Sequence, residues 1–488
     1  MYALVMRHET RTLTRSPAFL WVLLLLLAAL GFGAWSGTRT LDHQARGMKA
    51  MVSDTEAIRT KFRVDLEKYE RKIAATGEAM QMARYTYRPG EVPLGTNPGA
   101  VSKKPEPAVL PPTGLAAFAT GQSDLQLSYV AVSAVPMAKI TEKSELGNPV
   151  NLKRGSFDLA FVIVFLLPIF ILAISYDMLS SEHERGTLAM VLSHPISLGK
   201  LMTSKVISRA AIIVAVVLAG GFAALLTIGT QLDSPDTWMR FGLWIAATLL
   251  YSCFWFALAV LVNAMGRNSA TNGLVLAGVW LALTAVVPTL VSVVATSTYP
   301  TPSRFDFITA SRDAQTASEK NYVEALNQYF YDHVEYTPGA NVKDFLAVSM
   351  AKADAVDKAM APLYARFQTQ LARQDRMVSR FQFLSPAIMM QQALNSISGT
   401  DAGRYANFIE QVSAFRTEWT GYFAKRFLND EPLRSAEYDQ IPRFQYQEEP
   451  RSVPLSRTAP ALLGMGILAM LITLLAVNRI RRYQVAAR

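Results

Sequence analysis

The residues best suited to chemistry lie in one short charged segment, Ser181–Leu188, with the sequence Ser-Glu-His-Glu-Arg-Gly-Thr-Leu. Two carboxylates, Glu182 and Glu184, precede Gly186, a residue type that permits a sharp turn. A proline turn and two lysines follow. This arrangement is typical of a compact amphipathic element, and the alternative is an ordinary solvated loop. The sequence contains no residue arrangement typical of a hydrolase or an oxidoreductase, so we expect no catalytic residue.

The sequence also lacks a phosphate-binding loop of the form GxxxxGK[ST], because Gly199-Lys200 is followed by Leu201 and has no upstream glycine at the required position. This chain therefore does not bind ATP by that route, and if the protein is ATP-driven, a separate subunit must bind ATP and Mg²⁺. Cys253 is the single cysteine, so neither a disulfide nor a Cys/His zinc cluster is expected, and the five histidines are scattered. We expect no metal site and no cofactor in this chain.

Six long runs without charged residues indicate a helical membrane protein. Hydrophobic residues make up 51% of the 488 residues and charged residues only 18%. Each run can supply the roughly 20 apolar residues that a helix needs to cross a hydrocarbon core of about 30 Å. We therefore predict an all-α polytopic membrane protein, which excludes a soluble enzyme, a disordered chain and a peripheral membrane protein. The predicted spans are 17–35, 159–176, 210–232, 241–266, 270–297 and 458–478.

The distribution of charge predicts the side of the membrane that each loop occupies. With the amino terminus inside, the inward segments 1–16, 177–209, 264–269 and 479–488 hold 12 Lys and Arg against 4 Asp and Glu, while the rest of the chain holds 36 against 34. Most of the net charge of +10 is therefore inward, as the positive-inside rule requires. The charge needs no nucleic-acid partner to explain it. The basic tail is interpreted as a topology anchor that meets membrane lipid headgroups.

Segments of several kinds connect the spans. Residues 1–16 either form an amphipathic helix at the inner interface or simply flank the first span. Within the outward segment 36–158, apolar residues recur every three to four positions from about 40 to 87, which predicts a long helix. Seven prolines in 88–113 predict an extended, irregular connection.

The second outward segment, 298–457, also has helical periodicity. An apolar stripe runs along Val342–Leu371, where Pro362 is expected to kink or divide the helix, and a further helix is expected at Tyr405–Phe427. Neither outward segment shows sustained strand alternation. Because 36–158 lies on the same side, we expect the two to pack together as one large, mainly helical extracytoplasmic domain.

The inward loop 177–209 resembles the signature of ABC-2-type permeases, the membrane subunits of one class of ATP-driven ABC transporters. That signature has two glutamates shortly before Gly-Thr-Leu, then a Leu-Ser-x-Pro-x-Ser turn, then a lysine at the start of the third span. The resemblance implies that the loop couples the permease to a separate ATPase subunit. The coupling residues that it implies are Glu182, Glu184, Arg185, Gly186, Thr187, Leu188, Pro195 and Lys205.

A second stretch resembles the ABC-2 permeases that carry a large extracytoplasmic insert domain of unknown function. Its motif residues are Ser385, Pro386, Gly399, Thr400 and Asp401, followed by a helix rich in aromatic residues. The alternative interpretation is helix capping, with Ser385 as the N-cap before Pro386 and Asp401 as the N-cap of the next helix. Both interpretations can hold, because a shared motif can be purely structural.

The resemblance implies an exporter in a bacterial inner membrane, built from two copies of this permease or from this chain and a related one, with both termini cytoplasmic and the large domain periplasmic. Pro168 and Pro288 lie inside the second and fifth spans, where missing hydrogen bonds would allow bending during gating. The rival interpretation is a membrane-anchored scaffold or receptor that binds a periplasmic protein. A secondary transporter fits less well, because the span interiors carry no ionisable residue. The sequence does not identify the substrate.

Overall fold

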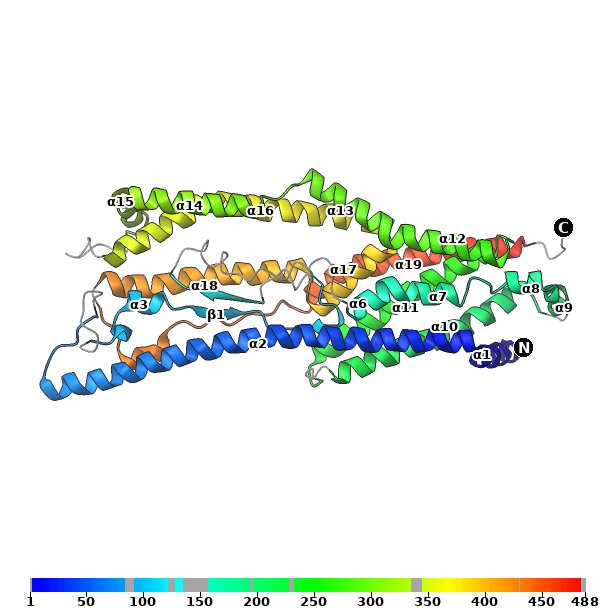
Figure 1. The fold of residues 1–488 in the computed structure, drawn as a ribbon, viewed down its shortest axis with the longest axis horizontal. Helices are drawn as coiled ribbons and strands as arrows, with labels where there is room; N and C mark the ends of the chain where they lie inside the picture. Colours follow the sequence, from blue (N-terminus) through cyan, green and yellow to red (C-terminus); the bar gives the residue numbers. More distant parts are fainter. Residues whose placement is uncertain are drawn as a thin grey trace.

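The residues that the computed structural model describes are 2–83, 92–121, 128–134, 157–193, 196–227, 232–334, 345–429 and 431–483. Over these residues the chain is mostly helical, and the molecule is elongated (Figure 1). The apolar helices lie together in one half. The other half holds the outward helices and a two-stranded sheet.

Within the described residues, five helices are long and apolar enough to cross a membrane, as expected of an all-α membrane protein. The fifth span contains the π-helical turn η4 (Ala282–Val286) between α12 (Ser269–Leu281) and α13 (Val287–Thr298). The other four helices are α2 (Pro17–Thr76), α10 (Leu198–Thr227), α11 (Pro235–Asn263) and α19 (Ser452–Arg481).

The second predicted span, 159–176, is shorter than expected. It consists of α6 (Leu159–Phe161), the π-helical turn η3 (Val162–Leu166) and α7 (Leu167–Ala173), and the chain continues as turns through residue 179. The helical part is below the roughly 20 residues of a full span. A six-span topology therefore stays a prediction.

Helix α10 begins at Leu198, inside the segment 177–209 that the sequence predicts as a loop. Lys205 and Arg209 consequently lie on the helix and not before it. Their charges are accommodated because Lys205 pairs with Glu182 and Arg209 pairs with Glu9. The predicted third span begins at residue 210, after the last charged residue, and therefore misses this extension.

The amino-terminal residues form α1 (Tyr2–Arg15), which packs against α10 and is therefore more than flanking sequence. Helix α2 then runs for 60 residues, so that the first span and the following amphipathic segment are one continuous helix (Figure 1). It ends at Thr76, earlier than the predicted residue 87, because Gly77 adopts a left-handed conformation with φ of 73° and donates its N–H to the Ile73 carbonyl.

The proline-rich segment is more regular than its composition predicts. It contains η1 (Leu94–Thr96), α3 (Pro98–Ser102) and β1 (Glu106–Val109), and β1 pairs antiparallel with β2 (Tyr129–Val132). The expected irregular connection is thus wrong for these residues. Prolines are compatible with a first helical turn and with an edge strand, where a missing N–H leaves no ladder bond unmade. Residues 84–91 lie outside the described part.

The second outward segment forms an arm of three helices, α14 to α16, and a further long helix, α18, beside the sheet. Its elements are α14 (Arg304–Lys320), α15 (Tyr322–Asp332), α16 (Phe345–Phe381), η5 (Gln382–Leu384), α17 (Pro386–Ser398), α18 (Ala402–Leu428) and η6 (Ser435–Gln440).

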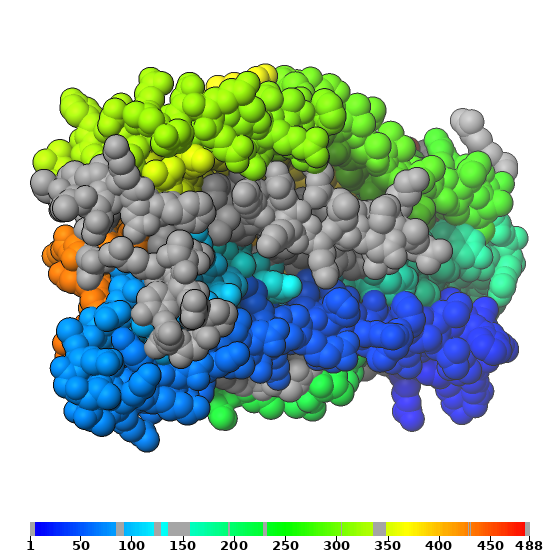
Figure 2. All heavy atoms as spheres, turned by 60° about the vertical axis from the view of Figure 1, so that its left-hand side comes forward, coloured from blue at the N-terminus to red at the C-terminus, as the bar shows by residue number. Residues whose placement is uncertain are grey.

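Pro362 lies inside the continuous helix α16, so it does not divide that helix, and Val342 falls outside the described residues. The blue surface of α2 and the green surface of the α14–α15 arm lie on opposite edges of the molecule (Figure 2).

The two outward segments pack together, because side chains from both form one buried apolar cluster. Helix α18 covers the helix predicted at Tyr405–Phe427, and its apolar side faces α2 and the sheet. The buried members of this cluster include Leu66, Tyr69, Ile73, Val130, Val132, Phe408, Val412, Phe415, Trp419 and Phe423.

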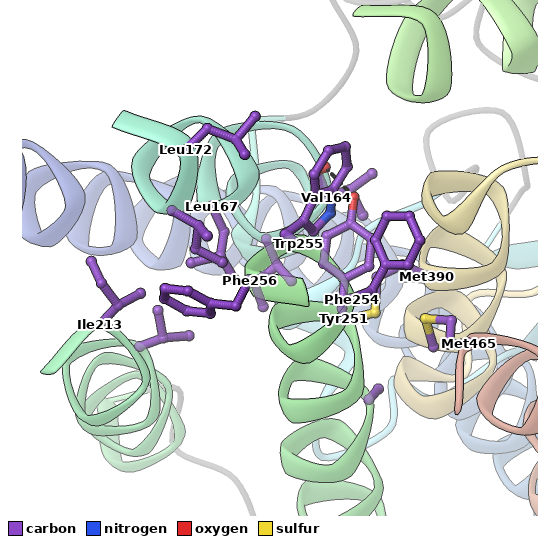
Figure 3. Close-up of a cluster of buried hydrophobic side chains, with 14 of the residues drawn as sticks. Val164, Leu167, Leu172, Ile213, Tyr251, Phe254, Trp255, Phe256, Met390 and Met465 are labelled. Atoms are coloured by element: carbon purple, nitrogen blue, oxygen red, sulfur yellow. Dashed lines mark hydrogen bonds between the residues drawn. The ribbon is translucent and has the colours of Figure 1, made fainter. Parts of the chain in front are cut away.

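Helix α17 belongs by sequence to the second outward segment but joins the apolar cluster of the spans. It packs against α11 and α19, and Met390 of α17 lies near Met465 of α19 (Figure 3). The large side chains Trp244, Tyr251 and Trp255 of α11 are fully buried in the same cluster. The span half and the outward half are therefore joined through α17.

Gly37 marks a close approach between α2 and η2 (Ala116–Phe118), because a methyl group at residue 37 would overlap the Ala117 carbonyl oxygen. Gly37→Ala should therefore lower the free energy of unfolding by about 1–3 kcal/mol, as overpacking does. Gly31→Ala on the same helix is the matched control, since a methyl group there meets no atom within 4 Å. Thermal unfolding of both variants in one detergent checks this, and equal midpoints would contradict the described contact.

Candidate functional site

The charged loop begins where the second apolar element unwinds, at residues 174–179. Main-chain groups there are bound by side chains of other helices. Arg209 Nη1 donates to the Ile174 carbonyl, and Asn263 Nδ2 donates to the Ser175 carbonyl at 2.9 Å. Lys205 Nζ donates to the Met178 carbonyl at 2.9 Å. Cations at the carbonyl end of a helix are favoured by its dipole, so α10 stabilises this break.

Glu182, in α8 (Ser180–Glu184), forms an ion pair with Lys205 of α10, with 2.5 Å between Oε1 and Nζ. Lys205 is only 6% exposed, so the pair is largely removed from water. Deleting one partner of such a pair lowers the free energy of unfolding much more than deleting one partner of an exposed pair does. The contact ties the short helix α8 to the third span.

Glu184 contacts the amino end of the fifth span. Its Oε1 accepts the Ser269 N–H at 2.6 Å and its Oε2 accepts the Ser269 hydroxyl at 3.0 Å. Ser180 and Ser269 share a further hydroxyl contact at 2.9 Å. Because the amino end of a helix carries partial positive charge, a carboxylate is stabilised there. The two glutamates thus meet one basic group and one helix amino terminus, both within this chain.

Gly186 forms the turn between α8 and α9 (Thr187–Leu192), with a left-handed φ of 70° that a side chain would strain. Thr187 closes the turn by donating its hydroxyl to the Glu182 carbonyl at 3.2 Å, and Leu188 is buried in the apolar cluster. Arg185 remains exposed, as does Met190 at 68%. The predicted residue Pro195 lies outside the described part of the chain.

Sequence reasoning misses four partners in this region: Glu9, Arg209, Asn263 and Ser269. Glu9 of α1 pairs with Arg209 at 2.7 Å, which attaches the amino-terminal helix to α10. Arg209 follows Lys205 by four residues, so the two cations share one face of a helix. That spacing, at the start of an apolar run, is the sequence signal that points to buried ion pairs.

The second motif lies at the junction of α17 and α18, at the opposite end of the spans, where they meet the outward half (Figure 1). Ser385 caps α17 and Asp401 caps α18, which confirms the capping interpretation. Gly399 takes the left-handed conformation that ends α17, and Thr400 donates its hydroxyl to the Ala119 carbonyl at 2.8 Å. The motif therefore connects the two outward segments.

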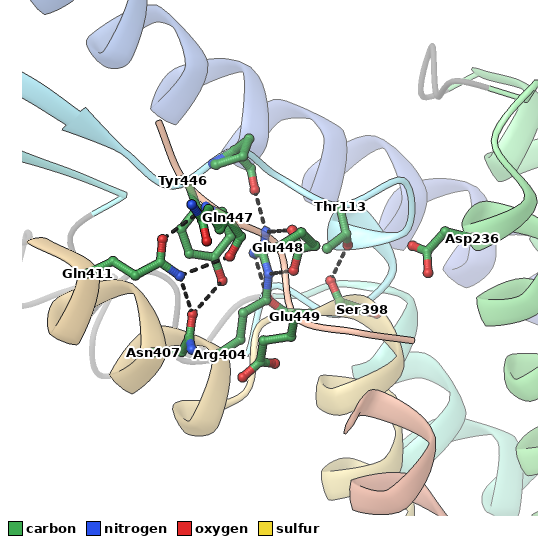
Figure 4. Close-up of polar contacts among 12 residues, drawn as sticks. Thr113, Asp236, Ser398, Arg404, Asn407, Gln411, Tyr446, Gln447, Glu448 and Glu449 are labelled. Atoms are coloured by element: carbon green, nitrogen blue, oxygen red, sulfur yellow. Dashed lines mark hydrogen bonds and ion pairs between the residues drawn. The ribbon is translucent and has the colours of Figure 1, made fainter. Parts of the chain in front are cut away.

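Side chains from several elements converge on the carbonyl end of α17. Arg240 of α11 donates to the Ile397 carbonyl at 2.9 Å, and Thr113 donates to the Ser398 carbonyl at 2.5 Å (Figure 4). Arg404 of α18 donates to the Gly399 carbonyl at 3.2 Å. These bonds give the terminal carbonyls of α17 the donors that its own backbone no longer supplies.

Arg404 also joins this region to the segment before α19. Its Nε and Nη2 donate to the two carboxylate oxygens of Glu448, at 2.9 and 2.7 Å (Figure 4). Burial alone would lower the pKa of Arg404, but the hydrogen bonds and the charge of Glu448 outweigh it, and the pKa lies above its usual value. Arg457 of α19 pairs likewise with Glu449 at 2.8 Å and with Asp401 at 3.2 Å.

Pro168 and Pro288 occupy equivalent places in two spans. Pro168 is the second residue after η3, and Pro288 is the second residue after η4.

The two predicted motifs do not form one site. The glutamate loop and the junction of α17 and α18 lie at opposite ends of the apolar helices, and the prolines lie within these helices.

The sequence pattern described as "ABC-2 family transporter protein" matches residues 3–478, which is nearly the whole chain. The chain belongs to the ABC-2 transporter family. It is thus a transporter membrane subunit, a permease with several helices that are long and apolar enough to span a membrane.

Two relatives are similar over part of their length. Both are named "Probable ABC transporter permease protein NosY". The protein from Stutzerimonas stutzeri is 32% identical over 126 residues, which cover 25% of this chain and 45% of the relative. The protein from Pseudomonas aeruginosa strain PAO1 is 28% identical over 125 residues, which cover 25% and 46%. The chain therefore spans about half the length of these curated relatives.

Removal of the buried cation should show what the ion pair contributes. Lys205→Met leaves the Glu182 carboxylate without its cation and should cost about 2–4 kcal/mol of unfolding free energy, slightly less than a fully buried pair, because part of Glu182 stays exposed. Lys200→Met is the matched control, since Lys200 is exposed on the same helix. Thermal unfolding in detergent measures both, and an unchanged midpoint for Lys205→Met would show that the pair is not formed.

Proposed function

We propose that this permease couples ATP hydrolysis by a separate ATPase subunit to export of a substrate or to movement of its outward half. The observation that carries the proposal is the short α8–α9 turn, which is exposed on one side and braced on the other by α10 and α12. A force applied to the exposed side would act directly on the third and fifth spans through Lys205 and Ser269.

The glutamates have partners inside the chain, since Glu182 pairs with Lys205 and Glu184 binds Ser269. In this proposal they pass movement to the third and fifth spans, and Glu184, which is also exposed, belongs to the surface that meets the ATPase. Arg185 and Met190, which remain exposed, form that surface together with Gly186. An exposed arginine and an exposed methionine in one short turn suit a protein partner, because both residue types are enriched at protein interfaces.

The remaining parts of the proposal concern partners and orientation. ATP and Mg²⁺ bind to the ATPase subunit, and a second copy of this chain or a related permease completes the membrane part. Both termini and the α8–α9 turn face the cytoplasm of a bacterial inner membrane. The outward half is periplasmic, where it contacts the substrate or a periplasmic protein. The rival proposal, a scaffold without transport, predicts that no nucleotide-binding subunit co-purifies with the chain.

The coupling surface can be tested by changing its exposed residues. Arg185→Glu with Met190→Glu should leave folding intact, because both side chains are exposed, while permease-dependent ATPase activity falls at least tenfold, which needs only about 1.4 kcal/mol of lost binding. Arg71→Glu is the control, since Arg71 of α2 is 81% exposed in the outward half. Equal activity of the double variant and the parent in one lipid mixture would remove this turn from the mechanism.

Cysteine accessibility tests the orientation. After Cys253→Ala, a single cysteine at position 331, where Tyr331 is 79% exposed, should react with a membrane-impermeant maleimide from the periplasmic side. A cysteine at position 190 should react only once the cytoplasmic face is opened, because positively charged inward loops define that side. The reverse pattern would invert the topology.

A further inference from the structure

Two of the apolar elements contain the same local break. The π-helical turn η3 begins at Val162 and η4 begins at Ala282, and in each case a proline stands six residues after the first residue of the turn. Proline lacks the N–H that a helix needs, and single π-helical turns accommodate such irregularities. Each break therefore releases main-chain carbonyl oxygens inside the apolar half.

The released carbonyls accept hydrogen bonds from side chains of other helices. Val164, four residues before Pro168, accepts the Tyr251 hydroxyl at 2.8 Å (Figure 3). Leu283, five residues before Pro288, accepts the Ser385 hydroxyl. Neighbouring helices satisfy such carbonyls in membrane proteins because lipid offers no donor.

The two breaks are also linked to each other. Trp280, just before η4, donates its indole N–H to the Phe165 carbonyl of η3 at 3.2 Å. Helix α17 packs against both η3 and η4. The Trp280–Phe165 hydrogen bond and the packing of α17 thus both link the two turns.

Ser385 both caps α17 and donates a hydrogen bond to the fifth span. Its side-chain oxygen accepts the N–H groups of Ala387 at 3.1 Å and Ile388 at 3.3 Å, which caps α17, while its hydroxyl hydrogen is donated to Leu283. The side chain is fully buried. Any change of bend at η4 must therefore either break this hydrogen bond or move the amino end of α17.

We propose that Ser385 is a positioning residue that holds η4 against α17, so that the two proline breaks, at η3 and η4, change their bend together. The fifth span alone could flex at Pro288, but α17 contacts η3 as well, and Trp280 ties the two turns directly. The two bends then change together, and Ser385, which holds them, lies in the second outward segment. This inference concerns the permease alone and does not depend on the ATPase partner.

Hydrogen–deuterium exchange of the isolated full-length chain in lipid nanodiscs tests the proposal. Ser385→Gly removes the donor at little cost to the cap, because glycine is nearly as good an N-cap. We expect amide exchange to rise at least tenfold in 282–288 and also to rise in 162–168. Ser385→Thr, which retains the hydroxyl, should restore the parent exchange in both segments, and this would not follow from loss of packing.

Two further variants keep the test decisive if Ser385→Gly folds poorly. Tyr251→Phe removes the hydroxyl that donates to Val164 in η3 and should raise exchange in both segments. Ser252→Ala is the matched control, because the Ser252 hydroxyl is also buried but donates to Thr248 of its own helix α11. A rise confined to the altered turn would overturn the coupling, and no rise in either variant would overturn the holding role of these hydroxyl groups. ATPase activity measured separately tests the proposed function and not this inference.

Discussion

A carbonyl oxygen that loses its helical donor inside an apolar bundle must find another donor within the protein. This constraint explains three features of the permease. The unwound end of the second apolar element is bound by Arg209, Asn263 and Lys205. The π-helical turns are bound by hydroxyl and indole groups, and the carbonyl end of α17 is bound by Arg240 and residues of the outward half. Each break is thereby a junction between elements that are distant in sequence.

These junctions form a continuous mechanical connection along the molecule. The α8–α9 turn is braced by the third and fifth spans, the fifth span is held at η4 by Ser385, and α17 is fixed at its other end to the outward half. In the proposed function, this connection passes movement of a separate ATPase subunit to the outward half of the permease. In this proposal, a movement at the α8–α9 turn is passed through these junctions to the outward half.

The sequence alone predicts the membrane class, the helix α18 and the N-caps Ser385 and Asp401, because apolar length and capping residues are local signals. It does not predict the partners of Glu182 and Glu184, since pairing within the chain depends on which helices become neighbours. The start of α10 at Leu198 is missed for the same reason: buried ion pairs allow a span to begin among charges. The two four-residue strands are too short for alternation to be recognised.

The account depends on the exposed side of the α8–α9 turn being the contact for the energy source. A photo-crosslinking amino acid at position 190, in cells that produce the intact transporter, tests this most directly, with the same label at position 331 as the reference. We predict that position 190 yields an adduct whose partner carries a GxxxxGK[ST] phosphate loop, and that position 331 does not. An adduct of that ATPase at position 331, or none at position 190, would contradict the account.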